Sequence, residues 1–181
     1  VTLEIVAVDD RASSVTGKEV AQQLVDAGVV AVIGHLNSGV SIDAAPIYAA
    51  KNIVQMAIST NPKYCNLGFP TTLRLVANDT LQAKAIGSYA AGNLNANKFA
   101  VVDDATPYGK GLADGAAEQL TKAKKEIVLR LSFDDKTTAF DDLAAKMKAA
   151  GVEVLVTTLS DFQVLAILEG LKKVDYTKMS I

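Results

Sequence analysis

The sequence predicts an α/β fold built from parallel βαβ units and divided into two similar halves. Short apolar runs rich in β-branched residues alternate with longer segments of helical period, which is typical of a parallel sheet with crossover helices. Near residues 76–79 a short strand is followed at once by a newly capped helix, which marks a break. Half of the 181 residues are hydrophobic and four are proline, so the chain can bury a core and is neither disordered nor fibrous. We therefore expect two domains, residues 1–77 and 78–181, with a hinge near 76–78.

The first half is predicted to contain four short strands and two helices. The strands are the apolar runs Leu3–Val8, Val29–Ile33, Ile53–Ala57 and Leu73–Val76. A capping box at Thr16–Glu19 begins the first helix, and Gly28 ends it. Ser38 follows the second strand and is expected to cap a helix that runs to about residue 51. Prolines, asparagines and a glycine leave residues 59–70 without periodicity, which predicts a long loop of the kind that often carries function.

The second half is predicted to continue the same alternation. Asp79 is expected to cap the first of its helices, and Pro107 stands in the first turn of the next, where its missing N–H is harmless. Glycine at position 151 closes a third helix. The predicted strands are Phe99–Asp103, Glu126–Phe133 and Val154–Thr158, and the two later helices are Phe140–Ala150 and Asp161–Lys173. Residues 179–181 begin a further element, so we expect the chain to be an internal piece of a longer protein.

Composition excludes several classes of protein. The 18 basic and 20 acidic residues give a net charge of −2, and the lysines do not form a basic stripe, which argues against a nucleic-acid partner. The longest apolar runs are far shorter than the roughly 20 residues that span a bilayer, and no covalent membrane anchor is visible. Cys65 is the single cysteine, so an internal disulfide and a thiolate metal cluster are excluded.

Ligands of open parallel sheets bind beyond the carboxyl ends of the strands. Two of the turns at those ends are rich in hydroxyl groups: Asn37-Ser38-Gly39 and Ser59-Thr60-Asn61. Hydroxyls beside free N–H groups at a helix N-terminus suit a carboxylate or a phosphate. The alternative is plain helix capping by Ser38 and turn formation at Asn61-Pro62.

Three further motifs were weighed as signs of an enzyme, and none of them supports one. The segment Tyr108–Asp114 resembles a dinucleotide fingerprint, but Asp114 occupies the third glycine position. The acidic pairs Asp9-Asp10 and Asp103-Asp104 follow strands, as Mg²⁺-binding carboxylates do, but the third strand ends in Ala57-Ile58-Ser59 without an acceptor aspartate, so solvated strand-end carboxylates are the preferred interpretation. His35 is the lone histidine and lacks a nucleophile elbow, so a hydrogen-bonded turn residue is the preferred interpretation. We expect no catalytic residue, no metal site and no cofactor.

Five motifs, in this order and spacing, resemble the leucine/isoleucine/valine-binding proteins of ABC importers. They are Leu3-Glu-Ile-Val-Ala-Val-Asp-Asp10, Val32-Ile-Gly-His-Leu-Asn-Ser38, Ser59-Thr-Asn-Pro62, Leu73-Arg74 and Tyr108-Gly-Lys-Gly-Leu-Ala113. The resemblance covers nearly the whole chain. It implies the type I periplasmic binding fold, which has two doubly wound three-layer αβα lobes with mostly parallel sheets. It also implies that one strand and helix precede Val1 and that the chain continues past Ile181, so both lobes are incomplete.

The resemblance further implies roles for single residues. The hydroxyls of Ser38 and Thr60, with the backbone of Ile58 and the adjoining Ser59, would hold a ligand α-carboxylate on the first lobe. Tyr108 would face the ligand from the second lobe, although it could equally be a packing residue at a helix start. Asp161 stands where branched-chain binders carry a tyrosine, and it could pair with an ammonium group or cap its helix.

One departure from the family leaves the ligand spectrum open. Ala12 and Asn37 occupy the positions that a disulfide often links in the family. The function implied is non-catalytic binding of an amino acid, branched-chain-like, or a related small carboxylate, for delivery to an ABC transporter permease outside the cytoplasm, in the periplasm. The alternatives are a ligand-sensing domain of a receptor or regulator with the same fold and an α/β enzyme.

Overall fold

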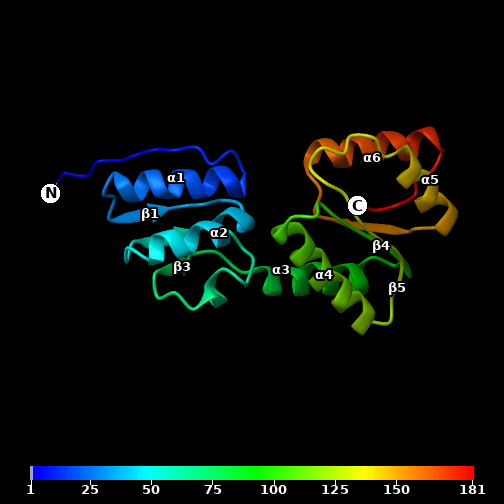
Figure 1. The fold of residues 1–181 in the computed structure, drawn as a ribbon. Helices are drawn as coiled ribbons and strands as arrows, with labels where there is room; N and C mark the ends of the chain where they lie inside the picture. Colours follow the sequence, from blue (N-terminus) through cyan, green and yellow to red (C-terminus); the bar gives the residue numbers. More distant parts are fainter. Residues whose placement is uncertain (1) are drawn as a thin grey trace. The chain divides into compact units, whose positions relative to one another are not determined.

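The structure is a computed structural model that describes residues 2–181 (Figure 1). Two compact units divide the chain between Asn78 and Asp79, and each is described by itself. We call residues up to Asn78 unit 1 and residues from Asp79 unit 2. Both units are built from parallel strands and helices, so the predicted α/β class is confirmed.

Unit 1 has one small parallel sheet with the strand order β1-β2-β3. Its elements are α1 (Ser14–Asp26), β1 (Ala31–Ile33), α2 (Ser38–Ala49), β2 (Val54–Ala57), the 3-10 turn Cys65–Leu67 and β3 (Thr72–Arg74). Helices α1 and α2 pack on one face of this sheet, where Val32 and Tyr48 share a buried cluster. The opposite face is largely open among the described residues, since Ile33 is 87% exposed.

The predicted strand Leu3–Val8 is wrong, because the structure assigns no strand before β1 in the described part of the chain. Alternation and β-branched side chains favour an extended backbone, but a strand forms only where a neighbour accepts and donates the ladder hydrogen bonds. The described ladders of unit 1 join β1, β2 and β3 only. Sequence pattern alone therefore overestimated this element.

Two predicted helix caps in unit 1 are also wrong. The N-cap of α1 is Ser13, whose side chain accepts a hydrogen bond from the Thr16 N–H, so the helix begins earlier than the capping box predicted. The N-cap of α2 is Asn37, and Ser38 is the first helical residue. A cap lies just outside the helix, and neighbouring Asn and Ser residues are equally good candidates for it.

Unit 2 is a three-layer αβα sandwich with the parallel strand order β5-β4-β6. Its elements are α3 (Asp79–Asn93), β4 (Lys98–Asp103), α4 (Pro107–Lys122), β5 (Glu126–Ser132), α5 (Asp141–Ala150), β6 (Val154–Thr157) and α6 (Asp161–Lys173). Helices α5 and α6 cover one face, where Val102 is buried, and α3 and α4 cover the other, where Val101 is buried. Ser180 makes a parallel bridge to Val154 at the β6 edge.

Candidate functional site

Two strand ends meet at the N-terminus of α2 in unit 1. β1 leads into the turn that begins α2, and β2 leads into the loop that follows residue 57. The Ser38 hydroxyl, which is buried, accepts a hydrogen bond from the Asn61 N–H at 3.2 Å. This bond joins the two hydroxyl-rich turns, so the structure brings together Ser38, Ile58, Ser59 and Thr60 as one group, which we call the α2 site.

The N-terminus of α2 is open to a negatively charged group. Asn37 makes no side-chain capping bond, and the first turn holds no acidic residue. The first N–H groups of a helix lack intrahelical acceptors, and the helix dipole adds positive potential there. Such a terminus binds carboxylate or phosphate without a further cation.

Ser59 is the most informative residue of the α2 site. It is 2% exposed, and its hydroxyl has no hydrogen-bond partner among the described residues. A buried hydroxyl without a partner costs about 1–3 kcal/mol. Such a group is expected where a ligand supplies the missing partner.

The neighbours of Ser59 are held open rather than buried. Ile58 is exposed, and Thr60 is half-buried. The Arg74 guanidinium, on β3, donates to the Asn61 carbonyl at 3.1 Å and to the Thr60 carbonyl at 3.5 Å. Arg74 therefore holds the loop by hydrogen bonds to its backbone. Its position in the sequence did not reveal this role.

A hydrogen-bonded chain supports the α2 site from the protein interior. The Nδ1 of buried His35 lies 2.6 Å from an Asp10 carboxylate oxygen, and its Nε2 lies 3.2 Å from the Tyr48 hydroxyl. In the tautomer that carries its proton on Nδ1, this nitrogen donates to Asp10 and Nε2 accepts from Tyr48. The Ser41 hydroxyl donates to the His35 carbonyl. His35 is thus a hydrogen-bonded residue of the turn between β1 and α2, as the sequence indicated.

Burial also fixes the protonation of Tyr48. Desolvation, followed by the nearby Asp10 charge, raises the pKa of Tyr48 to about 12. The hydroxyl therefore stays a neutral donor at physiological pH. The chain Asp10–His35–Tyr48 needs that donor, because the acceptor nitrogen of His35 has no other partner that the structure describes.

In unit 2 Tyr108 occupies the second position of α4. Thr106 is the N-cap, and its side chain accepts from the Gly109 N–H. Tyr108 is 36% exposed. Desolvation by burial, with smaller contributions from the Asp79 and Asp104 charges, raises the pKa of Tyr108. It therefore offers a neutral hydroxyl donor beside an apolar ring.

Asp161 is the first residue of α6 and is exposed. The N-cap of this helix is Ser160, which forms a capping box with Gln163. The capping alternative for Asp161 is therefore wrong, because the preceding serine already fills that position. Within the described residues, the Asp161 carboxylate accepts a hydrogen bond from the Phe162 N–H.

The turns that carry Tyr108 and Asp161 lie at the same end of the unit 2 sheet. A Cβ placed on Gly109 would lie 2.0 Å from an Asp104 carboxylate oxygen and 2.7 Å from the Thr158 hydroxyl. A side chain at this position would displace both groups. Tyr108 and Asp161 thus follow two neighbouring strand ends within unit 2.

A charged cluster that the sequence did not reveal joins β4, α4 and β5. Arg130, on β5, forms ion pairs with Asp103 at the end of β4 and with Asp114 in α4. Asp103 is fully buried, which corrects its interpretation as a solvated strand end. Asp114, which interrupts the dinucleotide fingerprint, thus has a structural partner. An arginine in a strand of mixed polarity carries no local signal for such a pair.

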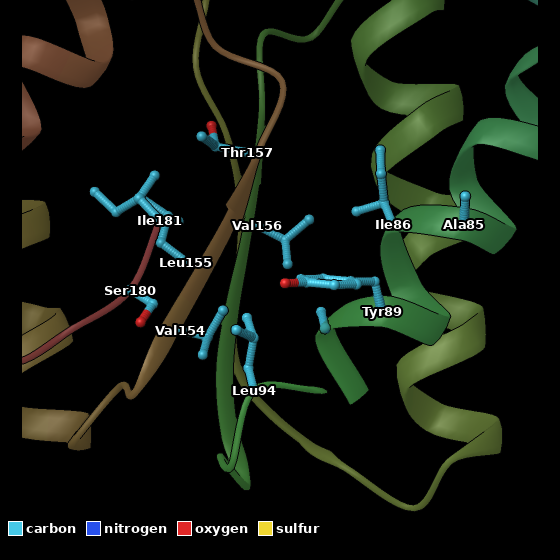
Figure 2. A pocket seen from close by; sticks show the side chains of 11 residues that line it. Ala85, Ile86, Tyr89, Leu94, Val154, Leu155, Val156, Thr157, Ser180 and Ile181 are labelled. Atoms are coloured by element: carbon cyan, nitrogen blue, oxygen red, sulfur yellow. The ribbon is translucent and has the colours of Figure 1, made fainter. Parts of the chain in front are cut away.

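Unit 2 also has an apolar pocket of about 650 Å³ between α3 and β6. Figure 2 shows Ile86 and Tyr89 of α3 facing Val154 and Val156 across it, with Ile181 beside them. None of the described residues that line it carries a charged side chain. It contains none of the predicted site residues.

Two absences hold within residues 2–181. No group of three or more His, Cys, Asp or Glu side chains is arranged to hold a metal ion. No helix in this range has both the length and the apolar character needed to cross a membrane.

Comparison with known proteins places these features in a wider group. The family described as "Periplasmic binding protein" matches residues 1–181. The Leu/Ile/Val-binding protein homolog 1 of Brucella melitensis is 37% identical over 148 residues, which are 81% of this chain and 40% of that protein.

Two solved structures share the fold. A leucine-binding protein from Thermotoga maritima matches with a TM-score of 0.89 and 20% identity over 98% of this chain and 51% of that chain. A solute-binding protein of an ABC transporter from Rhodopseudomonas palustris, in complex with 3,4-dihydroxybenzoic acid, matches with a TM-score of 0.81 and 20% identity, over 95% of this chain and 47% of that one. The chain thus spans about half or less of the proteins it matches.

Proposed function

Because the chain belongs to the periplasmic binding protein family, we propose that it is part of a non-catalytic solute-binding protein. The ligand is an amino acid of the branched-chain class or a related small carboxylate. The Brucella melitensis relative is named for leucine, isoleucine and valine, and the Rhodopseudomonas palustris structure holds an aromatic acid. A carboxylate is the chemical group that these ligands have in common.

The buried and unpartnered Ser59 hydroxyl is the observation that carries the proposal. In the proposed complex the ligand carboxylate lies at the N-terminus of α2 and accepts from Ser59 and Thr60 and from the backbone at Ile58. The Ser38 oxygen already accepts from Asn61, so its own hydrogen remains available for the carboxylate. Each hydrogen bond to a charged carboxylate is stronger than a hydrogen bond between two neutral groups.

The remaining site residues belong to unit 2. Tyr108 contributes a neutral hydroxyl and a ring face to the ligand, and Asp161 pairs with the ammonium group if the ligand is an amino acid. A ligand without an ammonium group, such as a hydroxybenzoate, gains nothing from Asp161. The two ligand classes are therefore distinguished by the effect of Asp161→Asn on affinity.

In the whole protein the two units are proposed to be parts of two lobes, residues 1–77 and 78–181, with a hinge near 76–78. A ligand that contacts both lobes stabilises the closed state, since it binds that state more tightly than the open one. The closed protein would deliver the ligand to an ABC transporter permease from an extracytoplasmic, periplasmic location.

Calorimetry of the full natural chain that contains these residues tests the proposal. The twenty amino acids, 3,4-dihydroxybenzoate and other small carboxylates form the panel. Ser59→Ala should lower affinity about tenfold or more, and Thr60→Ala should weaken binding by about 1–3 kcal/mol, because each removes a hydrogen bond to a charged group. Heat from none of the panel would refute the binding role.

The Ser59→Ala variant has a second, opposite expectation. Without ligand its free energy of unfolding should be unchanged or higher, because an unpaired buried hydroxyl is removed. Thr71→Val is the matched control, since the Thr71 hydroxyl is also buried and without a partner but lies outside the α2 site. It should leave affinity unchanged. Equal affinity in Ser59→Ala, Thr60→Ala and wild type would show that the carboxylate binds elsewhere.

A further inference from the structure

Arg130 bridges three elements of unit 2. Its guanidinium pairs with the Asp103 carboxylate at the end of β4, and one of its nitrogens lies 2.6 Å from an Asp114 carboxylate oxygen in α4. It also donates to the Leu131 carbonyl. The planar guanidinium offers donors in a rigid fork, so it can hold two carboxylates in fixed directions.

Asp103 transmits this contact to the turn between β4 and α4. One of its oxygens accepts from the Ala105 N–H at 2.8 Å, and the other accepts from the Ser132 hydroxyl at 2.9 Å. Ala105 has a φ of 59°, a left-handed conformation that costs energy for a residue with a side chain. The fully buried carboxylate therefore maintains a turn that the local sequence would not choose.

That turn leads directly into Tyr108. Thr106 caps the helix, and Tyr108 follows two residues later. Asp114 lies on the same helix six residues beyond Tyr108. Arg130 thus holds both the entry to α4, through Asp103, and the body of α4, through Asp114.

The packing in front of α4 leaves little freedom to compensate. A Cβ on Gly109 would meet the Asp104 and Thr158 side chains at 2.0 Å and 2.7 Å, so the first turn of α4 packs closely on these strand ends. The Asp103 carboxylate that Arg130 pairs with holds the turn that leads into this part of α4. The position of the Tyr108 ring consequently depends on Arg130.

We propose that Arg130 is a positioning residue for Tyr108 and sets ligand affinity without touching the ligand. The inference concerning affinity rests on the proposed binding function, whereas the placement of Tyr108 does not. Among the described residues Arg130 is the cation that pairs with the buried Asp103, whereas Lys110 pairs with Asp114.

A double-mutant cycle in the full natural chain tests the affinity claim, with L-leucine and 3,4-dihydroxybenzoate as probes. Arg130→Lys should weaken binding about tenfold, because one ammonium group cannot hold both carboxylates, and the same change in a Tyr108→Ala background should weaken it less than about twofold. Equal effects in both backgrounds would overturn the proposal. Lys110→Met, which removes only the exposed partner of Asp114, is the control and should change affinity less than about twofold.

A second measurement needs no ligand. Desolvation raises the pKa of Tyr108, and this pKa is measurable by NMR with labelled tyrosine, assigned with Tyr108→Phe. Arg130→Lys should lower it toward the ordinary value as the ring moves into solvent. An unchanged Tyr108 pKa would refute the positioning role. If Arg130→Lys fails to fold, Asp114→Asn releases only the helix half of the bridge and should show a smaller shift of the same sign. Absence of binding in wild type with a shifted Tyr108 pKa would refute the function alone.

Discussion

Units 1 and 2 anchor the turn at a strand end in two different ways. In unit 1 an imidazole joins a carboxylate to a phenol, in the chain Asp10–His35–Tyr48. In unit 2 the Arg130 guanidinium joins two carboxylates, one of them fully buried. The first anchor ends on the Tyr48 hydroxyl, whose proton is lost at strongly alkaline pH. The second anchor depends on the permanent charge of Arg130 and is sensitive to the loss of a charged partner.

The two sheets also differ in how many of their faces the helices cover. The unit 2 sheet is covered by helices on both faces, and its central strand β4 is buried along almost its whole length. The unit 1 sheet is covered on one face only within the described residues, and its strands have three or four residues each. The buried apolar side chains of unit 2 therefore lie on both faces of its sheet. Those of unit 1 lie mainly between one face of the sheet and the helices α1 and α2.

The largest effect is expected from Arg130→Met. Removing one partner of a buried ion pair leaves an uncompensated charge on Asp103, and the expected loss of unfolding free energy is about 3–5 kcal/mol. Urea denaturation of the full natural chain measures it. Lys122→Met is the control: Lys122 pairs with Glu118 on the surface, so its loss should cost less than about 1 kcal/mol. Similar losses in both variants would mean that Asp103 is not held by Arg130.

The next effect separates the units by pH. Because the pKa of Tyr48 is about 12 in the folded state and its ordinary value is 10.0, the folded state retains this proton as the unfolded state loses it. The stabilisation is complete below pH 10 and about 2–3 kcal/mol is lost as the pH rises from 10 to 12. Amide hydrogen exchange, read separately for the two units, should show this loss in unit 1.

Tyr48→Phe is the control for that alkaline loss. Burial also raises the pKa of Tyr64 in unit 1, so the variant should retain only the part that Tyr64 contributes. The Arg130 bridge carries no proton that leaves in this range, because its hydrogen bonds to carboxylates raise the arginine pKa above its ordinary value despite desolvation. An alkaline loss in unit 1 that is the same in Tyr48→Phe and in wild type would contradict the assignment to Tyr48.

The smallest effects compare the sheet faces. Val101→Ala and Val102→Ala remove buried methyl groups from opposite faces of β4, and each should cost about 2 kcal/mol. Ile33→Ala on the open face of β1 should cost less than about 0.5 kcal/mol. The midpoint of urea unfolding provides the measurement. A large loss in Ile33→Ala would show that this face is covered in the full natural chain.

Much of the fold was predictable because its signals are local. Helix α6 begins and ends at the predicted residues, and glycine at position 151 closes α5 in the left-handed conformation. Periodicity, a stop residue and a cap act over a few residues, so a single sequence contains them. The expected strand Leu3–Val8 failed because a strand requires a partner that its own sequence does not specify.

The candidate site was predictable to a smaller extent. The two hydroxyl-rich turns were found because parallel strands end on one side of a sheet, and the bond from the Asn61 N–H to Ser38 joins them. The sequence could not show that Ser59 is buried without a partner. Nor could it show that Arg74 braces the loop, because those facts depend on how distant segments pack.

By itself, the sequence determined the α/β class and the order of the elements from the first helix onward. Only the tertiary structure decided which side chains support the strand ends: His35 between Asp10 and Tyr48, and Arg130 between Asp103 and Asp114. The physical reason is range. Backbone propensities and caps are set by neighbours along the chain, whereas the environment of a buried charge is set by residues that folding brings from elsewhere.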